Sequence, residues 1–407
     1  MVISRQGGKI VGTTAIVTAG AGARGAYEAG ALSVLVPRLL LEAAGKERIV
    51  LLGTSAGAIN TALLAASTDP AEAIQNMLQV WETTSASDVF ARLRRTAIRD
   101  ATSYLAELLG RGQINSLLDT AALRRTVEKK LDWGQLRDSL DRGKGWAHGA
   151  GIVATSSSSG RTTVFLQGKG IAHPPPDDFR GIDYVPVTLA APHVLASAAI
   201  PIAFLPVRVD PSPAKDGWFV DGGVRLNAPI TPALALGADR VIVVATTPDP
   251  DSPRSAPVAP GEPDVFDAGG IVLHALLVDR MAEDVHTLRK TNRFVEAAGK
   301  AGALPLAHRD TGQPYRQVQN LFFGPPEAGL ISAAANEVFA RNYRGWFKRL
   351  SDIGILGTML GGSSAESHGE ILSFLFFDPD FHSVLIHLGK KHAEEALGAG
   401  PGLPWRS

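Results

Sequence analysis

The segment IVLLGTSAGAINTALLAA, residues 49–66, decides how this chain is expected to fold. Its beginning, Ile49–Leu52, is a short apolar run that predicts a buried strand, and Ala58–Ala66 is an alanine-rich run that predicts a helix. Between them Gly53–Gly57 fits G-x-S-x-G, a sharp turn that lifts the hydroxyl of Ser55 out of the sheet. The pattern alone is weak, because about 0.3 chance matches are expected at this composition. The strand before it and the helix after it therefore carry the inference.

A similar strand–glycine–helix unit lies earlier in the chain. Thr13–Ala19 is rich in β-branched residues and predicts a strand, Gly20–Gly25 (GAGARG) interrupts it, and Ala26–Leu41 has helical spacing of its apolar residues. Two such units in succession predict a parallel sheet covered by helices. If the two strands are neighbours, their loops open at the same sheet edge and the Gly20–Gly22 amides face Ser55.

The rest of the chain continues the α/β pattern. Residues 70–142 have amphipathic helical spacing, and the Pro-rich stretch Pro248–Pro263, with six prolines, predicts a linker or surface loop. Ile371–Phe377 (ILSFLFF) is apolar; a buried strand is the favoured interpretation, and an acyl-channel lining is the alternative. The other predicted strands are Gly151–Thr155, Thr162–Gln167, Arg240–Ala245 and Val318–Phe323, and the other predicted helices are Thr188–Ala199, Ile271–Ala298, Ser332–Leu350 and Pro379–Leu397.

Composition excludes several classes of function. Lys+Arg and Asp+Glu both number 40 among 407 residues, so no overall basic field exists to collect nucleic acid. The chain has no cysteine, which excludes disulfides, thiolate catalysis and zinc–thiolate sites. No apolar run approaches the ~18 residues of a membrane-spanning helix, and Met1–Gly12 does not fit a secretory signal. We therefore expect a cytoplasmic protein and leave transient contact with a membrane surface open.

The glycine loop has two competing interpretations. Gly20–Gly25 satisfies G-x-G-x-x-G, the dinucleotide-binding fingerprint, which also expects an acid at the end of the second strand. Here that strand ends in Gly53–Gly57, and the nearest acids, Glu42 and Glu47, precede it. The alternative is an oxyanion-binding turn made of backbone N–H groups. It accounts for both glycine loops together, so we expect no nucleotide cofactor.

These residues resemble the patatin-like phospholipase family. That family pairs a loop G-G-G-x-R-G with G-x-S-x-G and a distant D-G-G or D-G-A. In this chain the loop is Gly20-Ala21-Gly22-Ala23-Arg24-Gly25, which departs at Ala21, and the acid motif is Asp221-Gly222-Gly223. Ala196–Pro201 is a further block of the family's kind, in the family's order.

The resemblance implies a three-layer α/β/α patatin-like fold with a mainly parallel central sheet and a mostly helical C-terminal extension. We expect a catalytic domain over residues 10–247, a Pro-rich linker over 248–266 and the helical region over 267–407.

The resemblance also implies the roles of the site residues. Ser55 is the nucleophile and Asp221 its partner in a Ser–Asp dyad. The oxyanion hole is the loop of Gly20, Ala21, Gly22, Ala23, Arg24 and Gly25, with the amides of Ala21, Gly22 and Ala23 as donors. Arg24 is expected to brace this loop rather than to supply charge. Gly53 and Gly57 shape the elbow, and Gly222 and Gly223 let the acid approach the nucleophile.

The implied activity is hydrolysis of acyl esters of phospholipids or related lipids, without a metal or cofactor. Two alternatives remain open. A Ser-His-Asp esterase would use a histidine after Asp221, such as His274, although this residue lies in an apolar helical stretch. An inactive patatin-fold scaffold is the other alternative, but it would be expected to lack the serine, the acid or the loop glycines.

Overall fold

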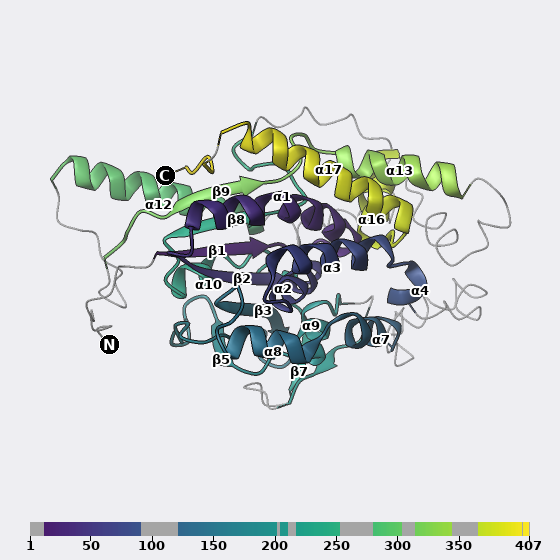
Figure 1. The fold of residues 1–407 in the computed structure, drawn as a ribbon, viewed down its shortest axis with the longest axis horizontal. Helices are drawn as coiled ribbons and strands as arrows, with labels where there is room; N and C mark the ends of the chain where they lie inside the picture. Colours follow the sequence, from purple (N-terminus) through teal and green to yellow (C-terminus); the bar gives the residue numbers. More distant parts are fainter. Residues whose placement is uncertain are drawn as a thin grey trace.

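The computed structural model describes residues 12–90, 121–201, 204–210, 217–252, 280–302, 314–343, 365–400 and 402–406. Its described part contains a nine-stranded central sheet with the order β5-β4-β3-β2-β1-β8-β9, and β7 and β6 extend it from β3 (Figure 1). The strands are β1 Thr13–Thr18, β2 Arg48–Thr54, β3 Gly149–Ser156, β4 Thr162–Gln167, β5 Ile182–Pro186, β6 Val207–Arg208, β7 Trp218–Asp221, β8 Arg240–Val244 and β9 Gln319–Phe323.

The sheet is mostly parallel, as predicted. β1 pairs in parallel with both β2 and β8, β2 pairs in parallel with β3, and β8 does so with β9. Antiparallel pairs occur where β3 meets β4 and where β7 meets β3 and β6. Because β1 and β2 are neighbours, the loops that follow them open at the same edge of the sheet.

Alternating side chains of the central strands build two separate cores, which explains the three layers. Ile16 and Leu51 belong to the core between the sheet and α1, whereas Val17 and Leu52 belong to the core between the sheet and α10. Helices cover both faces (Figure 1). Before the last three helices, the described helices are α1 Gly25–Ala43, α2 Ala56–Ala65, α3 Pro70–Glu82, α4 Ala86–Val89, α7 Ala121–Lys130, α8 Trp133–Asp141, α9 Ala191–Ser197, α10 Ile230–Ala235 and α12 Arg280–Lys300.

The C-terminal part of the chain packs onto the same sheet and helices. β9 adds an edge strand beside β8. It is followed by α13 Leu330–Asn342, α16 Ala365–Leu375 and α17 Pro379–Leu397, and α17 runs alongside α1 (Figure 1). The preference for a buried strand at Ile371–Phe377 was wrong: most of this stretch is the end of α16. A short apolar run fits either structure, and here the helix packs against α13 and the glycine loop.

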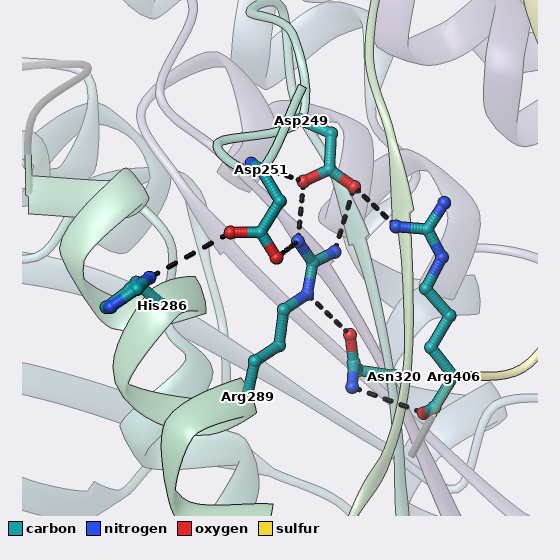
Figure 2. Close-up of polar contacts among 6 residues, drawn as sticks. All are labelled: Asp249, Asp251, His286, Arg289, Asn320 and Arg406. Atoms are coloured by element: carbon teal, nitrogen blue, oxygen red, sulfur yellow. Dashed lines mark hydrogen bonds and ion pairs between the residues drawn. The ribbon is translucent and has the colours of Figure 1, made fainter. Parts of the chain in front are cut away.

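Arg289, a buried arginine, is the centre of a polar cluster that joins four segments: α12, the residues after β8, β9 and the C-terminal residues. Arg289 on α12 is 6% exposed and donates to both oxygens of Asp249, at 2.5 and 2.9 Å. It also donates to Asp251 at 2.8 Å and to Asn320 of β9 at 3.2 Å, while Arg406 reaches Asp249 at 3.1 Å (Figure 2). A buried guanidinium with this many acceptors holds its neighbours in one geometry. The cluster therefore fixes α12, the segment after β8 and the C-terminal residues relative to each other.

Several sequence-based expectations fall wholly or partly outside the described residues: the Pro-rich stretch beyond residue 252, the position of His274, part of residues 70–142, the start of the predicted helix Ile271–Ala298 and the end of the predicted helix Ser332–Leu350. The proposed boundaries at 247 and 266 remain predictions. In the described part, no single helix is long and apolar enough to span a membrane. Gly369–Leu375 and Pro379–Leu397 pass that criterion only together, by length and composition, and they are bent by 103°.

Candidate active site

Ser55 lies in a strained turn between β2 and α2. Its backbone has φ +55° and ψ −122°, an uncommon conformation for a residue other than glycine. It directly precedes α2, and a Cβ atom on Gly57 would collide with the carbonyl oxygens of Thr18 and Ala19 at the end of β1. This close approach explains why the sequence has glycine there. The turn therefore holds Ser55, 3% exposed, against the neighbouring loop.

The glycine loop that follows β1 lies directly beside Ser55. A Cβ atom on Gly20 would be 3.2 Å from the Cβ atom of Ser55. The Gly20 amide is occupied, since it donates to Asn227 Oδ1 at 2.9 Å. The loop then forms a short 3-10 helix, η1 Gly22–Arg24, in which the Arg24 amide donates to the Ala21 carbonyl at 3.1 Å.

Three amides of this loop are unoccupied. Within the described chain, the N–H groups of Ala21, Gly22 and Ala23 donate to no other residue. Ala21, where the chain departs from G-G-G, has a negative φ of −144°, outside the left-handed region that favours glycine, and its side chain is buried in the core. The extra methyl group is therefore accommodated without backbone strain.

Asp221 ends β7 at the same edge of the sheet. β7 pairs with β3 so that Asp221 lies opposite Ala154, and the Asp221 amide donates to the Ala199 carbonyl at 2.9 Å. Its Oδ1 accepts from the Gly223 amide at 2.7 Å, within the 3-10 turn η2 Gly222–Val224. A Cβ atom on Gly222 would collide with the Val153 carbonyl oxygen and lie 3.0 Å from Thr54 Cγ2, so glycine here permits the turn to pack closely on β3 and on the end of β2.

The environment of Asp221 changes its acidity. Burial raises the pKa of Asp221 to about 7, and hydrogen bonding from the Ser55 side chain and the Gly223 amide opposes this rise. The second oxygen, Oδ2, is buried and makes no hydrogen bond of ordinary geometry within the described residues. Ser55 therefore lies close enough to Asp221 to affect its pKa without a hydrogen bond of ordinary geometry between the two side chains.

Two residues that sequence reasoning did not single out hold the site together. Ser197 on α9 accepts from the Ser55 amide at 2.9 Å and donates to the Val153 carbonyl at 2.5 Å. Asn227, which lies six residues after Asp221, accepts the hydrogen bond from the Gly20 amide. Ser197 lies within the family-like block Ala196–Pro201, which could have signalled it, whereas Asn227 had no signal in one sequence alone.

A buried polar network supports the helix that follows Ser55. Asn60 on α2 donates at 3.1 Å both to the Gly25 carbonyl and to Glu28 on α1, and it accepts from the indole of Trp81 on α3 at 2.7 Å. Burial raises the pKa of Glu28 well above its ordinary value, while hydrogen bonds with Asn60 and the Ala19 backbone oppose the rise. The network therefore joins the N-terminal parts of α1 and α2 to α3 and supports the helices that follow the glycine loop and the elbow.

An apolar pocket opens beside Ser55. It holds about 740 Å³ of empty space, its open mouth included. α2, α3, α4, α7 and α16 all contribute, as do Ala198 and Ile200 just after α9, and Ser55 and Gly22 lie on its wall. The apolar side chains of its lining include Ile59, Leu63, Trp81, Val89, Leu123, Val127, Phe204, Leu375 and Phe377. Such a pocket can hold an aliphatic chain.

Neither a histidine nor a group of metal ligands accompanies Ser55 and Asp221 in the part of the chain that the structure describes. No described histidine hydrogen-bonds to Ser55 or Asp221. No cluster of three or more potential metal ligands occurs among the described residues. His274, the candidate base of the Ser-His-Asp alternative, lies outside them.

The sequence was compared with models of known protein families. Residues 16–234 match the family model described as patatin-like phospholipase, which covers more than half of the sequence. The chain belongs to the patatin-like phospholipase family. The matched region of this patatin-like protein includes the glycine loop, the elbow and Asp221.

Solved structures with a similar arrangement are distant. VipD from Legionella pneumophila is 14% identical, with a TM-score of 0.35, over 77% of this chain and 61% of VipD. Human GIVD cytosolic phospholipase A2, solved with methyl gamma-linolenyl fluorophosphonate, is 11% identical, with a TM-score of 0.34, over 94% of this chain and 59% of that one. The patatin-like chain thus spans less than two thirds of each. A search of curated proteins found no match.

Proposed function

We propose that this protein is a lipid acyl hydrolase in which Ser55 and Asp221 form a catalytic dyad. The observation that carries the proposal is a buried carboxylate, with its pKa raised to about 7, beside a serine in a positive-φ elbow. A general base works best when its pKa lies near the operating pH. Asp221 therefore suits proton transfer at neutral pH better than an exposed aspartate with a pKa of about 3.9.

In the first half of the reaction, Ser55 Oγ attacks the ester carbonyl carbon and its proton passes to Asp221. The tetrahedral intermediate carries a negative oxygen, for which the unoccupied amides of Ala21, Gly22 and Ala23 are the proposed donors. When the intermediate collapses, the bond to the alcohol breaks and Asp221 returns the proton to the leaving alcohol. The acyl group is then bonded to Ser55.

In the second half, Asp221 accepts a proton from water, and the resulting hydroxide equivalent attacks the acyl carbon. The same three amides hold the second oxyanion. Collapse breaks the bond to Ser55 Oγ, which takes back the proton from Asp221. A fatty acid leaves, and the site returns to its starting state with one carboxylate serving both steps.

The proposed substrates are acyl esters of phospholipids or related lipids. The family assignment and the apolar pocket beside Ser55 support this class. Burial of a long acyl chain in the pocket would contribute about 0.8 kcal/mol of binding free energy for each methylene group. The proposal includes transient contact with a membrane surface, because esters of this class are found there.

Turnover of p-nitrophenyl acyl esters and of a panel of phospholipids, lysophospholipids and neutral acyl lipids tests the proposal. Ser55→Ala and Asp221→Asn should each abolish turnover, whereas the exposed-site controls Ser157→Ala and Asp178→Asn should retain it. Full activity in both dyad variants contradicts the dyad. Loss of activity in His274→Ala equal to that in Ser55→Ala would favour a Ser-His-Asp esterase. A pure, folded parent protein that is inactive on every ester would favour the scaffold.

A further inference from the structure

The glycine loop beside Ser55 is held by a helix from outside the matched family region. Arg24 is 2% exposed, and its Nη2 forms an ion pair with Glu370 of α16 at 2.8 Å. Its Nε donates to Ser373 Oγ at 2.8 Å, and Nη2 also donates to the Glu370 carbonyl at 2.9 Å. The guanidinium lies 3.7 Å from the centre of the Phe374 ring. One turn of α16 therefore surrounds the Arg24 side chain.

Burial makes these contacts necessary. A charged group removed from water must be paired and hydrogen-bonded, and removal of one partner leaves the other uncompensated. Burial lowers the pKa of Arg24, and the Glu370 carboxylate opposes that shift. Glu370 is itself held, because Ser332 of α13 donates to its other carboxylate oxygen. The chain of contacts runs from α13 through α16 to the glycine loop.

The backbone of the loop touches the same helix. Gly22 has φ +55°, and a Cβ atom there would collide with the Phe374 carbonyl oxygen. Leu375 and Phe377, the residues at and after the end of α16, line the apolar pocket. The same short segment thus contacts both the loop with the unoccupied amides and the proposed acyl site.

We propose that Glu370 and Ser373 are positioning residues of the reaction, and that they act through Arg24 to hold the Ala21–Ala23 amides beside Ser55. The inference rests on the proposed function. Neither residue touches the substrate in this account. The Arg24 side chain carries only N–H donors, and its contacts with Glu370 and Ser373 anchor the loop to α16. Oxyanion donors are effective only when fixed in place before the reaction, so a loosened loop should weaken binding of the transition state more than binding of the acyl chain.

Glu370→Gln and Ser373→Ala test the proposal in the full-length protein. The matched control is Glu337→Gln, a charge-neutralising change at an exposed position on α13. Two quantities are compared for each protein: kcat and KM for p-nitrophenyl octanoate, and the Ki of an octyl trifluoromethyl ketone. That ketone forms a hemiketal with Ser55 Oγ and so presents a tetrahedral oxyanion to the loop. All rates are expressed per active site, counted by covalent titration of Ser55 with a fluorophosphonate.

Glu370→Gln should lower kcat about tenfold or more and raise the Ki of the ketone by a similar factor, with KM nearly unchanged. Ser373→Ala should act in the same direction with a smaller effect, since it removes one neutral acceptor. Arg24→Lys, which keeps the charge but loses the forked geometry, should retain more activity than Arg24→Ala. Glu337→Gln should match the parent.

An unchanged kcat and Ki per titrated site in Glu370→Gln, even with a lowered melting temperature, would overturn the inference and leave the ion pair a purely structural one. The titration also separates this failure from failure of the proposed function. If the parent and Glu337→Gln are not labelled on Ser55, the proposed function itself fails. If Glu370→Gln does not fold, Ser373→Ala carries the test, and an unaltered Ki in that variant overturns the inference.

Discussion

The amide nitrogen of Ser55 lies 2.9 Å from the hydroxyl oxygen of Ser197, which in turn donates to the Val153 carbonyl of β3. This contact fixes the backbone of the strained elbow to α9 and to the neighbouring strand. A residue with positive φ costs about 1–3 kcal/mol and persists only where its surroundings hold it. Ser197 is therefore part of what keeps the Ser55 hydroxyl in a usable position.

Ser197→Ala should both destabilise the protein and slow catalysis. The variant leaves the buried Ser55 amide without an acceptor, at a cost of about 1–3 kcal/mol in the free energy of unfolding. The loosened elbow should lower kcat about tenfold. Urea unfolding and ester turnover measure the two effects, with the exposed Ser157→Ala as control. Unchanged stability and kcat would show that Ser197 does not hold the elbow.

The pH dependence of activity should report Asp221. Its pKa is raised to about 7, mainly by burial, and only the ionised form can accept the Ser55 proton. We expect kcat/KM for a p-nitrophenyl ester to rise with pH, with its midpoint near 7, and to level off above about pH 8. A profile that is flat from about pH 5 to about pH 9, as an ordinary aspartate with a pKa of about 3.9 would give, would contradict this assignment.

Asp221→Asn should stabilise the protein at neutral and alkaline pH. The folded state binds this proton more tightly than the unfolded state, so the free energy of unfolding falls as pH rises from about 4 to about 7. The shift from 3.8 to about 7 corresponds to ~4 kcal/mol as an upper bound. Thermal unfolding at about pH 8 should show the gain, and unfolding near pH 3.5 should not. The control is Asp178→Asn, at an exposed position. An Asp221→Asn variant that is less stable than the parent protein at about pH 8 would contradict the prediction.

The pocket should set the preferred acyl-chain length. Ile59 on α2 lines it and is only partly buried, so Ile59→Trp should fill space without removing a core residue. We expect kcat/KM for long p-nitrophenyl esters to fall about tenfold or more relative to that for the acetate. Leu41→Trp, at a position 76% exposed, is the matched control. An unaltered chain-length profile in Ile59→Trp would show that acyl chains bind elsewhere.

Much of the fold could be predicted because the sequence signals were local. The runs before Gly20 and Gly53 became β1 and β2, and their adjacency brought the two glycine loops to one edge, as expected. Ile371–Phe377 was misjudged because a short apolar run has no periodicity long enough to separate helix from strand. β5 was missed because its sequence, IDYVP, has little apolar alternation and forms a strand by pairing with β4.

The candidate site was predictable only where motifs carry it. Ser55, Asp221 and the glycine loop each lie in a recognisable short pattern. Glu370, by contrast, lies 346 residues from Arg24 along the chain, and only tertiary packing brings them together. Trp405 also makes contacts far along the chain: its indole donates to Glu42 at 2.8 Å, and its ring lies 4.8 Å from the Arg240 guanidinium carbon. No pattern in one sequence reveals such long-range pairs.

The most direct test of the central claim is the site of covalent labelling by a fluorophosphonate. The reagent should form a bond to Ser55 Oγ with loss of fluoride, and peptide mass mapping should find the adduct on the peptide that contains Ser55 and nowhere else. Labelling should disappear in Ser55→Ala and slow strongly in Asp221→Asn. Labelling of another residue, or undiminished labelling in Ser55→Ala, would contradict the account of Ser55 as the nucleophile.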